Sequence, residues 1–221
     1  MTKLKSTIIV GIFFLASLVS FLPLNAQADT LYMGTSYNII DYTYNSTTYT
    51  GNRGGGSFDV SKLNDVVLPY LYCVDLNSTI TLGTTYNDTV VRTDGYVKNG
   101  YVNNASQVAF LLFAYANDAS GTAYKEAALQ AAIWEVIYGD NFTLASTNST
   151  DIKNQYDSYI KGIGTHNVAA FRWITPQTGT TMYQGQVTGG GSGENVPIPP
   201  TAWLLGAGLV GLIGLRRKFQ K

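Results

Sequence analysis

The sequence is poor in the side chains from which many functional sites are built. Its 221 residues include one cysteine and one histidine, and charged residues make up 13%, against about 25% in an average soluble domain. One cysteine cannot form an intramolecular disulfide or a multi-thiolate metal site, and one histidine excludes zinc motifs with paired histidines. Lysine and arginine cluster only at the chain ends, so the basic face that nucleic-acid binding needs is missing. We therefore expect no nucleic-acid partner, no metal and no cofactor.

The formal charge is distributed unevenly along the chain. There are 14 basic and 14 acidic residues, and six of the basic ones lie in the terminal segments. Between Asp29 and Pro200, eight basic residues stand against fourteen acidic ones, so this part has a net charge of −6. The 16 tyrosines, 9 phenylalanines and 3 tryptophans can form a sizeable core with amphipathic rings at its edge.

The first 28 residues have the pattern of a secretory signal peptide. Lys3 and Lys5 precede an apolar run over residues 8–22, and the segment ends in Asn25-Ala26-Gln27-Ala28, an A-x-A type cleavage site. We expect residues 1–28 to be removed, which makes Asp29 the first mature residue. The alternative is an uncleaved membrane anchor.

The last 26 residues, 196–221, have three parts in a fixed order. A proline-containing stretch is followed by an apolar run over residues 201–215 and then by a basic end. Fifteen helical residues rise only about 22 Å, against a hydrocarbon core of about 30 Å, so the predicted transmembrane helix is short. By the positive-inside rule the basic end stays in the cytoplasm and the rest of the chain lies outside. The defining residues are Val196, Pro197, Pro199, Arg216, Arg217 and Lys218.

This tail resembles the PEP-CTERM sorting signal of Gram-negative bacteria, in which a short proline motif, an apolar Gly/Leu helix and a basic end are recognised by an exosortase. Here Pro197-Ile198-Pro199 replaces the usual Pro-Glu-Pro. The resemblance implies an exosortase-type processing enzyme as a partner. It also implies anchoring in the inner membrane before processing, and then a location at the cell surface or in the extracellular matrix. An ordinary single-span anchor would have the same topology without cleavage.

The part between the two ends is expected to be one domain. Residues 188–195 are rich in Gly and Ser and predict a flexible linker, so the folded unit is 29–187. We expect an α+β fold, with a strand-rich sandwich or barrel-like part and an inserted helical hairpin. The Gly54-Gly55-Gly56 run follows no clear strand and opens no helix, so a phosphate loop is not expected. Strands are predicted near 31–40, 42–50, 66–75, 79–82, 86–92, 168–174 and 180–187, and helices at 104–116, 122–138 and 151–161, the first with Asn103 or Asn104 as its N-cap.

Two side chains do not fit a plain globular domain. Cys73 lies in a predicted strand, where the period of two puts Leu71, Cys73 and Asp75 on one face. An unpaired thiol is a liability in an exported protein. In the second predicted helix, Gln130 lies on an apolar side, and burying an amide without partners costs about 1–3 kcal/mol. A reaction between the sulfur of Cys73 and the carboxamide of Gln130 would remove both difficulties.

A family resemblance, and not the spacing, connects these two residues. The segments Tyr72-Cys73-Val74-Asp75 and Leu129-Gln130-Ala131-Ala132-Ile133-Trp134 resemble the motifs of the thioester domains of bacterial surface proteins. In that family a strand cysteine is crosslinked to a glutamine that opens a Gln-x-Ala-Ile-Trp helix motif. Leu129 stands where the family often has Thr. The resemblance implies an internal Cys73–Gln130 thioester, with Tyr72, Ile133 and Trp134 as its apolar cover and Asp75 as a proton acceptor or a strand-end hydrogen-bond acceptor.

Such a bond implies a protein that acts once and is not an enzyme. A lysine amine can capture the acyl carbon of a thioester, so we expect covalent adhesion to an amine-bearing surface or matrix polymer. Two alternatives stay open. The crosslink can be inert and merely rigidify a matrix protein. Less favoured is a Cys-His acyl hydrolase, in which His166 would be the general base for Cys73, although the polar segment around His166 is more typical of a surface loop.

Overall fold

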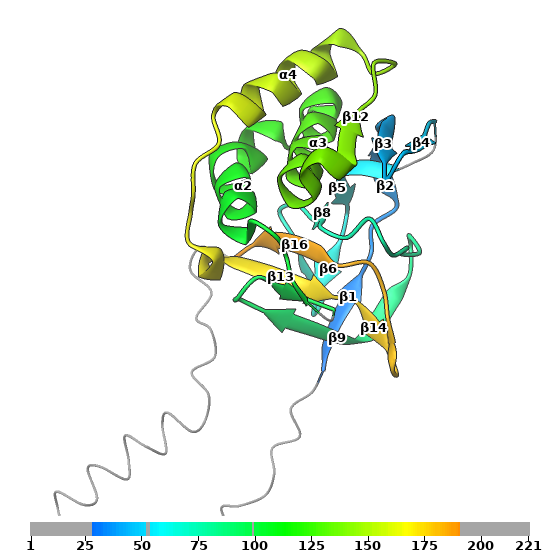
Figure 1. The fold of residues 1–221 in the computed structure, drawn as a ribbon. Helices are drawn as coiled ribbons and strands as arrows, with labels where there is room; N and C mark the ends of the chain where they lie inside the picture. The colour runs from blue at the N-terminus through cyan, green and yellow to red at the C-terminus, as the bar shows by residue number, and fades with distance from the viewer. Residues whose placement is uncertain (1–27, 52–53, 99, 191–221) are drawn as a thin grey trace, which may run out of the picture.

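The computed structural model describes residues 28–51, 54–98 and 100–190 (Figure 1). The predicted signal peptide, except for its last residue, lies outside the described residues. The predicted sorting tail, with Val196, Pro197, Pro199, Arg216, Arg217 and Lys218, lies outside them as well. Among the helices that are described, none is long and apolar enough to cross a membrane.

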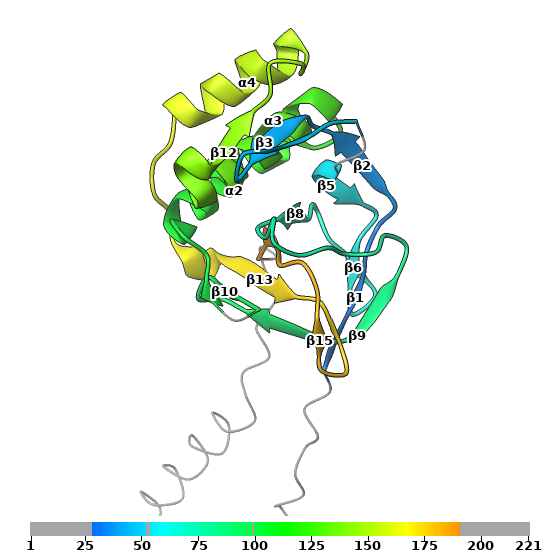
Figure 2. The same cartoon turned by 45° about the vertical axis from the view of Figure 1, so that its right-hand side comes forward.

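The described part has an α+β fold built on a curled sheet. Its seven strands are antiparallel to their neighbours and are ordered β7-β6-β1-β9-β13-β16-β8, so β8 lies at one end. Figure 2 shows the helices together on one side of this sheet, with β3 and β12 beside them. The strands in chain order are β1 (Asp29–Tyr32), β6 (Lys62–Leu63), β7 (Val66–Val67), β8 (Tyr72–Cys73), β9 (Thr85–Arg92), β13 (Phe171–Thr175) and β16 (Gln186–Gly189).

Smaller sheets surround this one. A three-stranded sheet has the order β12-β3-β4, and three further pairs of strands are β2 with β5, β10 with β11, and β14 with β15. Their bounds are β2 (Ser36–Ile39), β3 (Tyr42–Tyr44), β4 (Thr47–Tyr49), β5 (Gly54–Asp59), β10 (Tyr96–Val97), β11 (Gly100–Tyr101), β12 (Phe142–Leu144), β14 (Gln177–Thr178) and β15 (Thr181–Met182).

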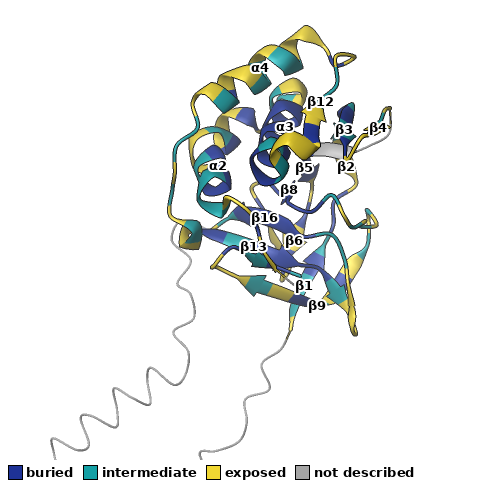
Figure 3. Ribbon diagram, viewed as in Figure 1, coloured by how far each residue is buried: buried dark blue, intermediate teal, exposed yellow. Residues whose placement is uncertain are grey.

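The helix that carries Gln130 lies in the centre of the molecule. The α-helices in the described residues are α2 (Ala105–Ala119), α3 (Ala123–Tyr138) and α4 (Thr150–Lys161), and two short 3₁₀ turns are η1 (Gly139–Asn141) and η2 (Val168–Ala170). Helix α3 packs against both other helices and against β2, β5 and β12. It is therefore buried along most of its length, as Figure 3 shows in dark blue.

The core is divided into two clusters on different sides of α3 and β8. One contains Tyr72 and Ile133 together with the faces of α2 and α4. The other contains Cys73 and Trp134 together with Leu31, Tyr42 and other side chains of the N-terminal strands. Because side chains alternate along a strand, the neighbours Tyr72 and Cys73 belong to different clusters. This division decides which predicted residues can reach the sulfur.

The α+β class and the main helices are confirmed. The predicted helices 104–116, 122–138 and 151–161 correspond to α2, α3 and α4, and α2 packs on α3 as a hairpin. A closing strand pair is present as β13 with β16, but its bounds differ from the prediction. Residues 168–170 form η2, and only residues 186–187 of the predicted strand 180–187 belong to β16. The strand-rich part is a curled sheet with small sheets beside it. This description is less specific than the predicted sandwich or barrel.

Several local predictions were wrong. The run 31–40 is divided into β1 and β2, the run 66–75 contains only the short strands β7 and β8, and residues 79–82 are not a strand. Asn104 is the N-cap residue of α2, as predicted, but it has a left-handed conformation and makes no side-chain capping bond, because its side chain donates to the carbonyl of Val136. Strand β16 extends to Gly189, so two residues of the predicted linker belong to the sheet.

The glycine run Gly54-Gly55-Gly56 is the start of β5. Gly54 and Gly55 pair with Ile39 and Asn38 of β2. A Cβ atom on Gly56, whose φ is +79°, would lie 3.0 Å from the Cβ of Glu126 on α3. The glycine therefore allows β5 to pack closely on α3, a contact between distant segments that local propensity does not reveal.

Candidate functional site

The side chain of Gln130 docks on the main chain of Cys73. The Cys73 N–H donates to Oε1 of Gln130 over 2.8 Å, and Nε2 of Gln130 donates to the Cys73 carbonyl over 2.8 Å. Cys73 is the last residue of β8, at the end of the sheet order, so the carboxamide pairs with it as a neighbouring strand would. The two residues are 1% and 0% exposed, respectively. Residues far apart in the sequence are thus in direct contact.

The sulfur of Cys73 is held by the main chain of Asp75. The S–H donates to the Asp75 carbonyl over 3.3 Å, and the Asp75 N–H lies 3.4 Å from Sγ as a donor. Burial raises the pKa of the Cys73 thiol to about 12, although the main chain of Asp75 and the indole of Trp134 lower it by smaller amounts. The thiol is therefore protonated at neutral pH and must lose its proton before it reacts as a nucleophile.

Trp134 lies one helical turn after Gln130 and beside the sulfur. Its indole N–H lowers the pKa of the Cys73 thiol. It has no partner within ordinary hydrogen-bond limits among the described residues. We therefore regard it as an electrostatic contact to the sulfur and not as a formed hydrogen bond. A buried N–H at this position is a donor available to a thiolate or to an acyl oxygen.

Tyr138 is a site residue that the sequence analysis missed. It lies two turns after Gln130 on α3, and its hydroxyl accepts the Leu76 N–H over 2.8 Å. Burial raises the pKa of Tyr138, the bond from Leu76 lowers it, and the nearby Cys73 and Asp75 raise it further. The spacing of Gln130, Trp134 and Tyr138 by four residues is the signal that could have found it.

The carboxylate of Asp75 faces away from the sulfur that its main chain holds. Oδ1 accepts the Asn77 N–H over 2.9 Å, and Oδ2 lies 3.4 Å from Nζ of Lys98. The predicted proximity of Cys73 and Asp75 is present, but the contacting groups are main-chain groups. The carboxylate borders a second cavity of about 360 Å³, which Lys98 and Tyr138 also line.

A second buried carboxamide lies opposite Cys73. Gln186 of β16 is the register partner of Cys73. Because both main-chain groups of Cys73 are directed at Gln130, this is a non-hydrogen-bonded pair, in which the side chains are close. Nε2 of Gln186 donates to the carbonyl of Gln184 over 3.2 Å. Gln186 was missed because strand register cannot be read from the sequence.

Two of the predicted cover residues are on the wrong side. Tyr72 and Ile133 are buried in the cluster formed with α2 and α4, whereas Cys73 and Trp134 share the other cluster. Tyr72 precedes Cys73 by one residue and so points to the opposite face of β8. Ile133 lies on the flank of α3 that faces α2. The apolar cover on the sulfur side therefore comes from Trp134 and the N-terminal strands.

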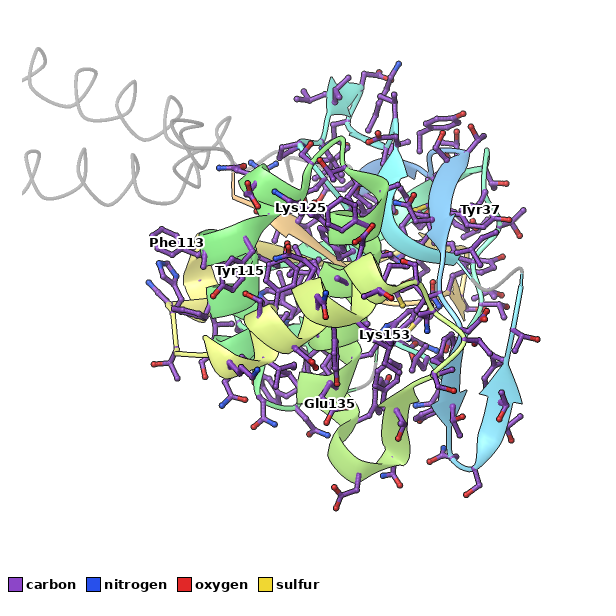
Figure 4. The ribbon with its side chains drawn as sticks, turned by 90° about the horizontal axis from the view of Figure 1, so that it is seen from above. Tyr37, Phe113, Tyr115, Lys125, Glu135 and Lys153 are labelled. Carbon is purple, nitrogen blue, oxygen red and sulfur yellow. The ribbon has the colours of Figure 1, made fainter. Side chains whose placement is uncertain are left out.

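The structure does not bring His166 to Cys73. The imidazole stacks on Phe113 of α2 with ring centroids 4.1 Å apart, and its second ring neighbour is Phe171. Phe171 belongs to the cluster that does not contain Cys73. In Figure 4, Phe113 lies at one edge of the molecule and Tyr37 of β2 at the opposite edge. His166 therefore cannot serve as the base for this thiol in the described arrangement.

An aromatic cavity of about 400 Å³ lies next to Trp134. It is bounded by Tyr42 and Tyr49 from β3 and β4 and by the segment 76–82. Trp134 lines this cavity and shares a core cluster with Cys73. Within the described ranges, no group of three or more His, Cys, Asp or Glu side chains is placed to hold a metal ion.

Comparisons with known proteins found one structural likeness. No protein-family model matches the sequence, and no curated protein matches it. Among solved structures, the chain is similar to the N-terminal thioester domain of a surface protein from Clostridium perfringens, with a TM-score of 0.39 and 14% sequence identity. The match covers 72% of this chain and 97% of that chain. At this TM-score the likeness does not assign a function, which has to be inferred from the site.

Proposed function

We propose that this is an exported surface or matrix protein that forms an internal Cys73–Gln130 thioester and uses it once, to attach covalently to an amine-bearing partner. The observation that carries the proposal is the pair of hydrogen bonds between the Gln130 carboxamide and the Cys73 main chain. They hold the electrophilic carbon of the amide next to the residue that bears the chain's single thiol.

The contacts support formation of the bond. Sγ of Cys73 attacks the side-chain carbonyl carbon of Gln130, the C–S bond forms, the C–N bond breaks, and the thiol proton leaves with Nε2 as ammonia. The Cys73 N–H already donates to the oxygen that becomes negative during the attack. The Asp75 and Trp134 N–H groups stabilise the thiolate.

Capture of a partner reverses thioester formation, with the amine of the partner in place of ammonia. A primary amine attacks the same carbon, a C–N bond forms, the C–S bond breaks, and a proton from the amine restores the Cys73 thiol. The product is an amide between Gln130 and the partner. Because both reacting residues are almost completely buried, bulk water is excluded and the bond survives until the partner arrives.

The route to the surface is part of the same proposal. An exosortase-type enzyme would process the tail after the signal peptide is removed, with the tail in the inner membrane until then. The partner would be a polymer of a neighbouring surface or of the extracellular matrix. The sequence pattern of the two chain ends supports these steps, and the net charge of −6 between residues 29 and 200 suits association with a cationic polymer.

A specific observation favours a second candidate function. The two bonds to Cys73 satisfy the buried carboxamide of Gln130 without any chemistry. A matrix protein with an unreactive crosslink, or with hydrogen bonds alone, would then be the result. Incubation with methylamine separates the two candidate functions, because a reactive thioester incorporates methylamine at Gln130 and an unreactive crosslink does not.

Intact-mass measurement on the mature protein tests the proposal directly. We expect a mass lower than that of the sequence by one ammonia, and the full mass in Cys73→Ala and in Gln130→Ala. Peptide mapping should find the crosslink between the peptides that contain Cys73 and Gln130. A wild-type protein with full mass and a titratable thiol would show that the thioester does not form.

A further inference from the structure

The cavity beside Trp134 has an uncharged lining that is rich in aromatic side chains. Four tyrosines contribute to it, namely Tyr37, Tyr42, Tyr44 and Tyr49, together with the indole of Trp134. Its volume of about 400 Å³ falls in the range of small-molecule sites. None of the described residues that line it is charged. The ligand it fits is therefore uncharged where it touches the wall.

The rings form a fixed surface. Tyr42 stacks on Tyr49 with centroids 5.0 Å apart and tilts against Trp134 at 5.0 Å. Tyr44 packs edge-on against Tyr138 at 4.9 Å. These contacts join β3 and β4 to α3, so the aromatic wall is held in place before a ligand binds. Tyr37 also lines the cavity and has 39% of its surface exposed. Figure 4 shows it near the edge of the molecule.

Apolar side chains and neutral polar groups complete the lining, the apolar ones being Phe58, Leu76, Ile80 and Leu82. Ser78, Thr79 and Gln184 border the same cavity. The carboxamide of Gln184 donates to the Ser78 carbonyl over 3.0 Å, and its Oε1 accepts from Gln186 over 3.2 Å. The hydroxyl of Tyr44 donates to Asn77 over 2.8 Å. The cavity thus combines flat aromatic faces with hydroxyl and amide groups that are fixed by neighbours.

This combination matches a sugar ring better than an alkylammonium ion. One face of a pyranose consists of C–H groups, which pack on the negative faces of aromatic rings, and its rim carries hydroxyls that pair with neutral donors and acceptors. An ammonium group is also attracted by aromatic faces. An ammonium ion that enters the cavity would, however, lose its hydration, and no carboxylate lines the cavity to compensate for that loss.

We propose that the aromatic cavity binds a sugar ring of a glycan, and that the amine captured at Gln130 belongs to an amino sugar of that glycan. The covalent step rests on the proposed thioester, whereas the binding step does not. A ring seated in the cavity lies against Trp134, which is one helical turn from Gln130 on α3 and shares a core cluster with Cys73. The cavity therefore selects the partner and Gln130 forms the bond to it.

The binding step is tested with the Cys73→Ala full chain, which cannot form a thioester. The probe is the N-acetylglucosamine tetramer, which has no free amine, and the measurement is calorimetric titration. We expect saturable binding that is weakened about two- to tenfold by Tyr37→Ala, the loss of one aromatic contact. Tyr124→Ala is the matched control, because Tyr124 is 38% exposed and does not line the cavity. Absence of binding, or equal weakening by both variants, would overturn the assignment.

The covalent step is tested with the thioester form of the wild type and the same tyrosine variants. Rates of incorporation at Gln130 are measured for the glucosamine tetramer and for methylamine, and their ratio cancels differences in thioester content. We expect Tyr37→Ala to lower this ratio and Tyr124→Ala to leave it unchanged. The N-acetylglucosamine tetramer should slow capture of the glucosamine tetramer. Competition by tetramethylammonium in its place would show that the cavity takes cations, and the sugar assignment would be wrong.

Discussion

At the scale of a single residue, the proposed function gives Gln130 two roles that use the same atoms. Oε1 and Nε2 pair with the Cys73 main chain, and in the thioester Nε2 is lost as ammonia. The Cys73 carbonyl then loses its donor, while the bond from the Cys73 N–H to the acyl oxygen can persist. In the proposed mechanism the hydrogen-bonded pair is the state from which the thioester would form, and its strength can be measured where the reaction is blocked.

Replacing Gln130 by Leu in a Cys73→Ala background should destabilise the protein strongly. Without the carboxamide, the buried N–H and carbonyl at position 73 have no partner, and each such group costs about 1–3 kcal/mol. We expect a loss of about 2–6 kcal/mol in the free energy of unfolding, measured by urea denaturation against Cys73→Ala alone. A loss below about 0.5 kcal/mol, the range of ordinary surface substitutions, would mean that the amide does not dock as described.

At the scale of the element, α3 brings the site together. Gln130, Trp134 and Tyr138 follow each other at intervals of four residues, so all three lie along one side of the helix. Gln130 reaches β8, Trp134 borders the aromatic cavity, and Tyr138 accepts from the Leu76 N–H in the segment that follows β8. The helix thus fixes the position of the Gln130 acyl group and of the segment that follows Cys73.

Tyr138→Phe should loosen the segment after β8 and expose the thioester to water. The substitution keeps the ring and removes the hydroxyl, so the Leu76 N–H loses its acceptor at a cost of about 1–3 kcal/mol. We expect faster release of a titratable thiol from the thioester form at neutral pH. Tyr124→Phe, an exposed position on the same helix, is the control. An unchanged rate of release would show that this contact does not protect the bond.

At the scale of the whole molecule, the sequence predicts what is local and misses what depends on two distant segments. The apolar periodicity and Gly139 delimit α3, and the strand around Cys73 follows from its β-branched and aromatic neighbours. The prediction that Ile133 covers the sulfur was wrong because α3 lies between two core clusters. Both flanks of the helix are therefore apolar, and periodicity gives no preference between them. The register that puts Gln186 opposite Cys73 is likewise a property of the folded sheet.

The crosslink should also change the stability of the whole domain. Cys73 and Gln130 are 57 residues apart. By the chain-entropy relation for disulfides, closing such a loop stabilises the folded state by up to about 4 kcal/mol. Methylamine opens the crosslink and leaves a secondary amide, whose oxygen can still accept the Cys73 N–H. In the trans form its N–H is directed away from the oxygen edge, so the Cys73 carbonyl lacks this donor, as it does in the thioester form. The methylamine-treated protein therefore differs from the thioester form mainly by the loop.

We expect the thioester form to unfold at a higher temperature than the methylamine-treated protein, and Cys73→Ala to unfold at the same temperature with and without methylamine. Both forms are measured at one scan rate, because an exposed thioester hydrolyses once the chain has unfolded and the transition is then not at equilibrium. The untreated wild type must show the loss of ammonia by mass. If its midpoint then equals that of the treated protein, the two crosslinked residues are already held together in the unfolded chain, and the loop argument is wrong.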